Sequence, residues 1–359
     1  MDAMNQLYPG EEMRRGAGFP QLAYYRPGDP LRPLVVFLPG GGHLARVAYG
    51  HPQGRKQDFL DYWLKEMGYG LLALSYPCDH PVFETLHPEM TITDWGNSAA
   101  EIARQIVSEY GLGPRVVLMG WSLGGRAARN FTLAAKRLSL AVDAFISLAA
   151  APPLPGSGVL DPASLTYTDE GLWSVMTPGS SLERERMAAI AAQNAVNGRQ
   201  VLSFEHYVRN YCANTPIQLR GERHRVKGGR RFNSEGDAAE DQGSFRFADY
   251  PLTGAIVPTL QADARHALTD ALTWSYLNSQ KIYYGLLKSR LDEGPLLSSD
   301  KWRSLRELFA GLPVRLSREV SGGHYFFLGE IGARQTINQM ASLLEEIAAL
   351  ESEIGALTR

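Results

Sequence analysis

The chain has few cysteines and no long apolar run. Its 359 residues include only two cysteines, Cys78 and Cys212. Two cysteines cannot build the disulfide framework of a small secreted domain, and they fit a reducing compartment. No stretch reaches the roughly 18 apolar residues of a membrane-spanning helix, and residues 1–20 lack the apolar region of a signal peptide. We therefore expect a cytoplasmic protein without a membrane span.

An excess of charge of either sign is also lacking. The 36 lysines and arginines nearly balance the 38 acidic residues, for a formal net charge of -2. This balance offers no electrostatic argument for binding nucleic acid or an anionic membrane. The Gly-x-x-x-x-Gly-Lys-Ser/Thr pattern of a phosphate-binding loop does not occur. We expect no nucleic-acid partner, no cofactor and no metal.

One short stretch, residues 115–125, combines a strand, a turn and a helix. An apolar run ends in Gly-x-Ser-x-Gly, from Gly120 to Gly124, and a helical pattern of small residues follows. Glycines on both sides of Ser122 permit a strained backbone and close packing of the strand against the helix. Such a turn presents the serine hydroxyl above the end of a sheet. A Gly-Ser turn that only joins two elements is the alternative, and the flanking strand and helix disfavour it.

Apolar runs of strand length alternate with helical patterns over the first 150 residues. The strand candidates are residues 21–26, 34–38, 71–76, 115–119 and 143–149, and the helix candidates are 57–67, 94–110 and 124–138. Continuous apolar runs are typical of strands that are buried on both faces. The alternation predicts an α/β fold with a mostly parallel sheet and helices on both faces. In such sheets the site lies at the carboxyl ends of the strands.

This pattern changes after residue 150, where prolines and glycine break it. We assign residues 1–150 to the first part of the core, 151–280 to a large, mainly helical lid insertion, and 281–359 to the second part of the core. Helical patches in the predicted insertion are residues 182–196, 201–211 and 259–278. The second part of the core contains strand candidates at 282–287 and 314–320 and helix candidates at 298–309 and 333–357.

A serine nucleophile needs a base and an acid that orients it. His324 follows the last predicted strand on a Gly-Gly turn, so we expect it above the same sheet edge as Ser122. The acid is expected after the strand that precedes the His324 strand, which selects Asp292. Two alternatives remain: Asp300, which suits the first turn of a helix, and Asp263, which lies on a helix assigned to the insertion.

The glycine-rich loop after the 34–38 strand is the candidate for an oxyanion hole. One backbone N–H is expected from Leu123, the residue after the nucleophile, and the second from Gly41. Gly40 and Gly42 are its neighbours in the loop, and a simple glycine-rich turn is the alternative interpretation.

These residues together resemble the α/β-hydrolase superfamily. The resemblance rests on the chain order Ser122, Asp292, His324 and on the elbow and glycine loop, and it covers roughly residues 21–150 and 280–359. The run Gly322-Gly323-His324-Tyr325-Phe326-Phe327 is also similar to the Gly-Gly-His-Phe-Phe-like signature that follows the last strand of thioesterases. In those proteins the acid precedes a helix with a tryptophan, and Asp292 followed by Trp302 fits that arrangement. The insertion is longer than their lids, and the glycine loop lacks their His-Ala-Gly-Gly form.

The resemblance implies a serine hydrolase. It would cleave an ester or thioester of a hydrophobic or aromatic acyl group, small or carrier-bound, through an acyl-enzyme on Ser122. An acyltransferase with the same triad is one alternative. A non-catalytic ligand-binding protein is another, although the chain order of serine, acid and histidine counts against it. Insertion aromatics would line the substrate site or form the core of the lid: Trp173, Phe204, Tyr207, Tyr211, Phe245 and Phe247.

Six basic residues gather in the segment 220–231. They are Arg220, Arg223, Arg225, Lys227, Arg230 and Arg231. Such a cluster would suit the phosphates of coenzyme A or of a carrier-bound pantetheine. We favour a solvated loop, because acidic residues at 235–241 partly balance the charge.

Overall fold

A sheet of eight strands forms the centre of the computed structural model, which describes residues 7–157, 166–175, 177–222 and 234–358. The strand order is β1-β2-β4-β3-β5-β6-β10-β11. The first two pairings are antiparallel, and all the others are parallel. The strands are β1 Glu11–Gly16, β2 Phe19–Arg26, β3 Leu34–Leu38, β4 Leu71–Ser75, β5 Arg115–Trp121, β6 Ala141–Leu148, β10 Thr253–Pro258 and β11 Ser317–Val320.

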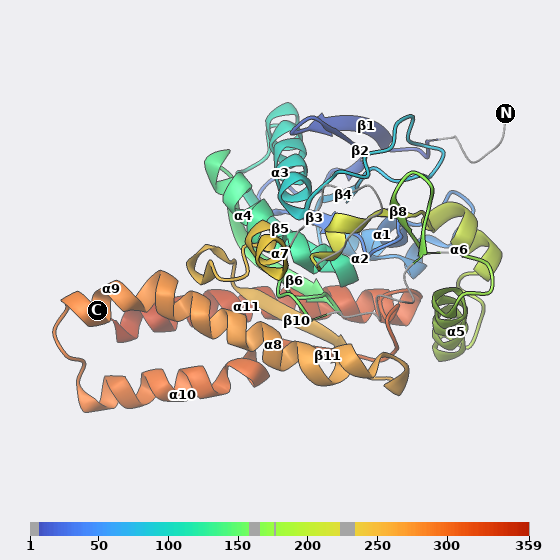
Figure 1. Ribbon diagram of the computed structural model, residues 1–359. Coiled ribbons are helices and arrows are strands. Elements are labelled where there is room, and N and C mark those ends of the chain that lie inside the picture. The colour runs from blue at the N-terminus through green and yellow to red at the C-terminus, as the bar shows by residue number, and fades with distance from the viewer. Residues whose placement is uncertain (1–6, 158–165, 176, 223–233, 359) are drawn as a thin grey trace.

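Helices cover both faces of this mostly parallel sheet, and the predicted α/β architecture is therefore confirmed (Figure 1). Alternate residues of β3 belong to separate apolar clusters. Val36 and Leu38 pack toward α3 Ile92–Glu109 and α4 Ala128–Arg137. Val35 and Phe37 pack toward α2 Leu60–Glu66 and α11 Glu330–Leu357. Successive side chains of a strand point to opposite faces of the sheet. Because helices cover both faces, apolar side chains are favoured at every position of these strands, and the apolar runs in the sequence are therefore continuous.

The predicted strand at 282–287 is wrong, because these residues are helical. They continue α8 Ala264–Ile282 as the π-helical turn Tyr283–Leu287. Ile282 and Leu287 are buried against helix α10 Ser299–Arg315. The Ile-Tyr-Tyr-Gly-Leu-Leu segment favours a strand by composition, but apolar packing along a continuous helix overrides that preference.

The sequence analysis missed two strands of this sheet, β1 at its edge and, with more consequence for the site, β10. It pairs in parallel with β6 on one side and with β11 on the other. The sheet therefore resumes at residue 253, and the predicted boundary at 281 is wrong. Helix α8, which was assigned to the insertion, belongs to the connection between β10 and β11. The strand contains Gly254 and Pro258, which weaken its signal. Glycine is needed at 254, because a Cβ there would lie 2.9 Å from Leu343 of α11.

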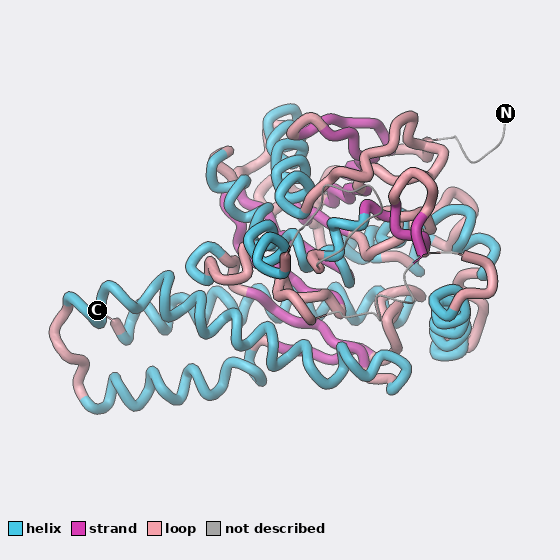
Figure 2. Tube along the Cα trace, in the orientation of Figure 1, coloured by secondary structure: helices cyan, strands magenta, loops and turns pink. Residues whose placement is uncertain are grey.

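A helical extension follows α8 and projects beyond the sheet edge (Figures 1 and 2). It consists of the distal part of α8, α9 Lys288–Glu293, α10 and the C-terminal half of α11. Leu305, Leu312, Leu350 and Ile354 form its apolar centre. The helices predicted at 298–309 and 333–357 are present. Because α10 continues to Arg315, the last strand is shorter than predicted and starts at residue 317.

The insertion lies between β6 and β10. Its helices are α5 Ser181–Val196, α6 Phe204–Tyr211 and α7 Glu235–Gln242. A small antiparallel sheet that the sequence analysis did not predict joins β7 Thr166–Tyr167, β8 Leu172–Ser174 and β9 Thr215–Pro216. The Leu44 amide donates to the Tyr211 carbonyl at 2.8 Å. This contact places the insertion beside the loop that leads from β3 to α1 Arg46–Tyr49.

Two sequence-level expectations concern the whole chain. Both cysteines are free and buried, in agreement with the absence of a disulfide framework. Within the described ranges, no helix combines the length and apolar character that crossing a membrane requires.

Asn278 of α8 joins this helix to β10 and offers a test of the corrected topology. Its side-chain oxygen accepts from the Thr253 N–H at 2.8 Å, and its amide group donates to the Thr253 carbonyl at 2.8 Å. Asn278→Ala leaves two buried backbone groups without these partners. We expect the free energy of unfolding in urea to fall by about 2–4 kcal/mol. Thr269→Ala, at an exposed position of the same helix, should change it by about 0.5 kcal/mol or less. Equal effects of the two substitutions would contradict the assignment.

Candidate active site

Ser122 lies at the apex of a strained turn between β5 and the 3₁₀ helix Ser122–Ala127. Its φ angle is +50°, which is unfavourable for a residue with a side chain. A Cβ at Gly124 would lie 2.5 Å from the Leu38 carbonyl oxygen, and one at Gly120 would lie 2.8 Å from Phe145. Both glycines are therefore needed for close packing, as the sequence motif predicted, and Ser122 is raised above the carboxyl end of the sheet.

The glycine loop after β3 runs directly past Ser122. A Cβ at Gly40 would lie 3.0 Å from the Ser122 Cβ. The Gly42 N–H already donates to Thr215 Oγ1 at 2.6 Å and to the Tyr76 hydroxyl at 2.9 Å. It is thus engaged in holding the loop. Gly41 and Leu123 both line the cavity that contains Ser122, which leaves Gly41 as the better candidate to donate to an oxyanion.

His324 lies in the loop after β11 and lines the same cavity as Ser122. Trp121, the residue before Ser122, donates from its indole Nε1 to the His324 carbonyl at 3.0 Å. The Trp121 and His324 rings lie 5.3 Å apart. The elbow and the histidine loop are therefore joined directly, although 202 positions separate Ser122 and His324 in the sequence.

The acid beside His324 is Asp263. Nδ1 of His324 donates to Asp263 Oδ2 at 2.8 Å. Asp263 follows β10, and the Gly322 carbonyl accepts from the Thr259 and Leu260 amides at 3.0 Å each. These two bonds tie the acid loop to the histidine loop, so the orientation of the imidazole is held by its backbone as well as by the carboxylate.

Asp292, the predicted acid, is placed elsewhere. It lies on α9 with its side chain 53% exposed and ion-paired to Lys288. Asp300 is in the first turn of α10, 87% exposed and 3.3 Å from Arg303. The sequence analysis expected the acid after the strand that precedes the histidine strand, but it took 282–287 for that strand. With β10 in place of 282–287, the same rule selects Asp263.

The protonation of this pair is shaped by burial and by mutual attraction. Burial lowers the pKa of His324, and the hydrogen bond and charge of Asp263 offset this only in part, so the net shift is downward from 6.5. Burial raises the pKa of Asp263, but His324 outweighs it and the net shift is downward. At neutral pH the pair therefore consists of a neutral imidazole and an ionised carboxylate, the state that a general base requires.

A second histidine, His266, lies beside His324. Nδ1 of His266 donates to Asp270 Oδ2 at 2.9 Å, and the His266 ring is 5.1 Å from the His324 ring. Possible metal-ligand atoms of Asp263, His266 and His324 lie within 4.8 Å of one another. These residue types suit a transition metal. A metal bound there would, however, compete for the ligand atoms through which Asp263 and His324 form their hydrogen bond.

The Gly41 peptide is held by polar groups that the sequence analysis also missed. Its carbonyl accepts from Nδ1 of His43 at 2.9 Å and from Nη2 of Arg186 at 2.8 Å. Because a carbonyl only accepts, Nδ1 of His43 carries the proton, and Nε2 accepts from the Tyr207 hydroxyl at 2.5 Å. Burial lowers the pKa of His43 well below its usual value. The one sequence feature that could have indicated this role is the position of His43 directly after the glycine loop.

The cavity above Ser122 has a volume of about 560 Å³, within the usual range of small-molecule sites. The insertion contributes one wall through Trp173, Leu182, Arg186, Ala189 and Arg220. Of the six insertion aromatics, Trp173 lines this cavity, Tyr207 and Tyr211 are fully buried in the core, and Phe245 is 72% exposed.

The basic cluster at 220–231 was expected to be a solvated loop, but its first residue is not exposed to solvent. Arg220 is buried, and its guanidinium lies 4.4 Å above the Trp173 ring. The other five residues of the cluster, at 223–231, lie outside the described residues.

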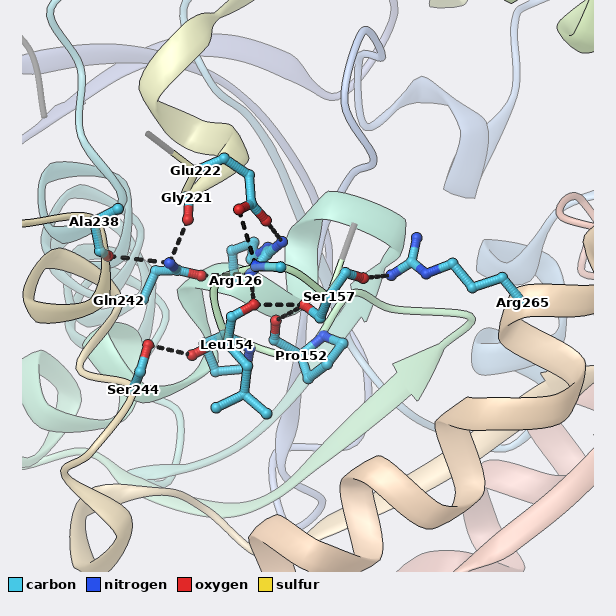
Figure 3. A network of polar contacts seen from close by, with 12 residues as sticks. Arg126, Pro152, Leu154, Ser157, Gly221, Glu222, Ala238, Gln242, Ser244 and Arg265 are labelled. Atoms are coloured by element: carbon cyan, nitrogen blue, oxygen red, sulfur yellow. Dashed lines mark hydrogen bonds and ion pairs between the residues drawn. The ribbon is translucent and has the colours of Figure 1, made fainter. Parts of the chain in front are cut away.

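A polar network connects the elbow to the insertion (Figure 3). Arg126, from the turn after Ser122, forms an ion pair with Glu222 at 2.8 Å. It also donates to the Leu154 carbonyl at 2.7 Å and to Gln242 Oε1 at 2.6 Å. Arg265 reaches the Ser157 carbonyl from α8. Three separate parts of the insertion are thereby anchored around the turn that carries Ser122.

Comparisons with known proteins find similar solved structures only at low sequence identity. No model of a known protein family matches the sequence, and no curated protein matches it. Similar solved structures include a carboxylesterase of the thaumarchaeon Nitrososphaera gargenis (13% identity, TM-score 0.43, covering 95% of this chain and 99% of the other). A soluble variant of monoglyceride lipase from Saccharomyces cerevisiae has 12% identity and a TM-score of 0.47, covering 96% and 97%. A thioesterase domain from the curacin biosynthetic pathway has 14% identity and a TM-score of 0.39, covering 92% and 98%. The functional argument therefore rests on the residues of the cavity.

The protonation state of His324 can be measured directly. We expect its imidazole to titrate below pH 6.5 in an NMR titration of histidine side chains, because burial disfavours the charged form. In Asp263→Asn the pKa should fall further, since the carboxylate that favours the imidazolium is lost. A pKa above 6.5 in the wild type, or one unchanged by Asp263→Asn, would contradict this pairing.

Proposed function

We propose that the protein is a serine hydrolase that cleaves a carboxylic ester or thioester. One observation carries this proposal: the hydrogen bond between His324 and Asp263 lies in the cavity that contains Ser122 on its strained elbow. A serine, a histidine base and a carboxylate that orients the base are the three groups of a catalytic triad. We assign these roles to Ser122, His324 and Asp263.

In the proposed mechanism, Oγ of Ser122 attacks the acyl carbonyl while Nε2 of His324 accepts its proton. Asp263 stabilises the resulting imidazolium and keeps Nδ1 as the donor. The negative charge that develops on the carbonyl oxygen is stabilised by the N–H groups of Leu123 and Gly41. His324 then protonates the leaving group. Water, activated by the same histidine, releases the acid from the acyl-enzyme.

The polar groups around Gly41 support its role in the oxyanion hole. His43 and Arg186 both donate to the Gly41 carbonyl, so the loop is oriented before substrate arrives. Preorganised donors of this kind stabilise a transition state without reorganisation during the reaction. The insertion, which forms one wall of the cavity, acts as a lid in this proposal and shields the reacting groups from bulk solvent, while leaving room for the hydrolytic water.

Two other functions use the same architecture. An acyltransferase would replace the attacking water with an alcohol or amine, and product analysis with added acceptors separates the two. A non-catalytic binding protein would have no need for the His324–Asp263 pair beside Ser122. That pair favours an enzyme.

Ser122 can be tested with a fluorophosphonate probe, which labels activated serines. We expect stoichiometric labelling of the wild type and none of Ser122→Ala, because the activated hydroxyl is absent. Hydrolysis of 4-nitrophenyl esters should fall by roughly 10⁶-fold in kcat. Labelling that persists in Ser122→Ala would refute the nucleophile, and an unlabelled wild type would favour a binding protein.

The identity of the acid can be decided by two matched substitutions. Asp263→Asn should lower kcat by about 10³–10⁴-fold, because the amide no longer fixes the productive tautomer of His324. Asp292→Asn, at an exposed position on α9, should leave kcat within about twofold. Steady-state kinetics with one ester measure both. The opposite ranking would restore Asp292 as the acid and refute the assignment of Asp263.

A further inference from the structure

The first two turns of α8 carry a second histidine–carboxylate pair beside the proposed triad. Asp263 immediately precedes the helix, His266 lies three residues later, and Asp270 follows after four more. Side chains that are three and four positions apart lie on the same face of a helix. Asp263 is hydrogen-bonded to His324 at 2.8 Å, and the His266 ring lies 5.1 Å from the His324 ring. One end of one helix thus brings two acids and a histidine to His324.

This second pair has the same hydrogen bond as the first. Nδ1 of His266 donates to Asp270 at 2.9 Å, as Nδ1 of His324 donates to Asp263 at 2.8 Å. His266 is 4% exposed and Asp270 is 1% exposed. A buried carboxylate at Nδ1 fixes the orientation of the ring and keeps the proton on that nitrogen. Nε2 of His266 is therefore a hydrogen-bond acceptor.

The acceptor is placed where a substrate can reach it. Among the residues that the structure describes, the ring of His266 forms one hydrogen bond, through Nδ1, and Nε2 has no partner. The side chain lines the cavity that contains Ser122. A ligand that displaces water from such an acceptor binds well only if it supplies a donor in return, because an unmatched polar group is costly.

The attachment of α8 to the core does not require this pair. Asn278 joins the helix to Thr253 of β10, and Nε1 of Trp274 donates to the Ala150 carbonyl at 3.2 Å. Both contacts lie further along the helix. The His266–Asp270 pair is at the end of α8 that faces the cavity, which favours a role toward the substrate.

The position beside His324 selects one part of the substrate. In the proposed mechanism His324 protonates the leaving group, so the departing atom lies within hydrogen-bond distance of Nε2 of His324. Ring nitrogens of His266 and His324 approach within 4.8 Å of each other. A donor that is a few bonds beyond the departing atom is therefore within reach of His266, whereas the acyl chain extends from the carbonyl in another direction.

We propose that the leaving group of the substrate carries a hydroxyl or N–H group and that Nε2 of His266 accepts a hydrogen bond from it. Asp270 is the positioning residue of this contact, because it keeps the lone pair on Nε2. His324 still protonates the departing atom, and His266 transfers no proton. This inference rests on the proposed hydrolase function and narrows its substrates to esters of diols or amino alcohols and to thioesters of thiols with a similar donor.

The test compares pairs of esters that differ only in one hydroxyl group. The 2-hydroxyethyl, 3-hydroxypropyl and 4-hydroxybutyl esters of butyric acid are each paired with the alkyl ester that has a methyl group in place of the hydroxyl. Release of butyrate is followed with EDTA present, because a metal at Asp263, His266 and His324 would occupy the same atoms. We expect the wild type to favour at least one hydroxyl ester by about threefold or more in kcat/KM, the effect of one neutral hydrogen bond.

Two substitutions remove the acceptor in different ways. His266→Phe keeps a planar ring but has no acceptor, so the ratio of kcat/KM within that ester pair should fall to about one. Asp270→Asn does not touch the substrate, and it should also lower the ratio, because an amide can bind either tautomer of His266. Each ratio is measured on one preparation, so a partly misfolded variant does not affect it.

His206→Phe provides the matched control. His206 lies on α6 and is exposed, so the same replacement there should leave the substrate ratio at the wild-type value. Wild-type ratios below about threefold for all three pairs would overturn the inference and leave the hydrolase function intact. A ratio that His266→Phe does not change, or that His206→Phe lowers equally, would overturn it as well.

A binding measurement separates the failure of this inference from the failure of the proposed function. Calorimetric titration of Ser122→Ala with the same ester pairs needs no catalysis. Tighter binding of a hydroxyl ester that is lost on adding His266→Phe supports the acceptor, even if the wild type hydrolyses none of the esters, a result that would refute only the hydrolase. Equal binding within every pair, in a protein that hydrolyses none of them, would overturn both proposals.

Discussion

The close approach of the β5 elbow to the end of β3 is the constraint on which the rest of the site depends. With a hydrogen in place of a side chain, Gly124 packs against the Leu38 carbonyl, and Gly40 packs against Ser122. This contact forces Ser122 into its positive φ angle and sets the glycine loop beside it. The positions of the proposed nucleophile and of the candidate oxyanion donors therefore follow from one packing arrangement at the carboxyl edge of a parallel sheet.

The remaining groups are attached to that centre by polar bonds between distant segments. Trp121 holds the His324 loop through its indole, and Gly322 holds the Asp263 loop through its carbonyl. Arg126 connects the turn after Ser122 to the insertion. Trp121, beside Ser122, and Arg126, just after the elbow, thus hold the His324 loop and the wall of the cavity around the serine.

Local patterns in the sequence predicted much of this arrangement. The strands of the first 150 residues were recognisable because their side chains enter two apolar layers, which produces continuous apolar runs. Ser122 and His324 were recognisable because glycine neighbours mark sharp turns at strand ends. Asp263 was kept only as an alternative to Asp292, because the short β10 contains Gly254 and Pro258 and was not recognised, whereas the helical segment 282–287 has the composition of a strand. Arg186 gave no local signal, since it resembles any other charged residue of an amphipathic helix.

The sequence alone determined the class of fold, the strained serine and the histidine that follows the last strand, because each depends on neighbours within a few residues. Only the tertiary structure decided which carboxylate meets His324 and which arginines face the cavity. Those choices depend on which strand lies between β6 and β11 and on how the insertion folds back over the sheet. Both are set by contacts between segments far apart in the chain, and such contacts leave no periodic pattern in the residues that make them.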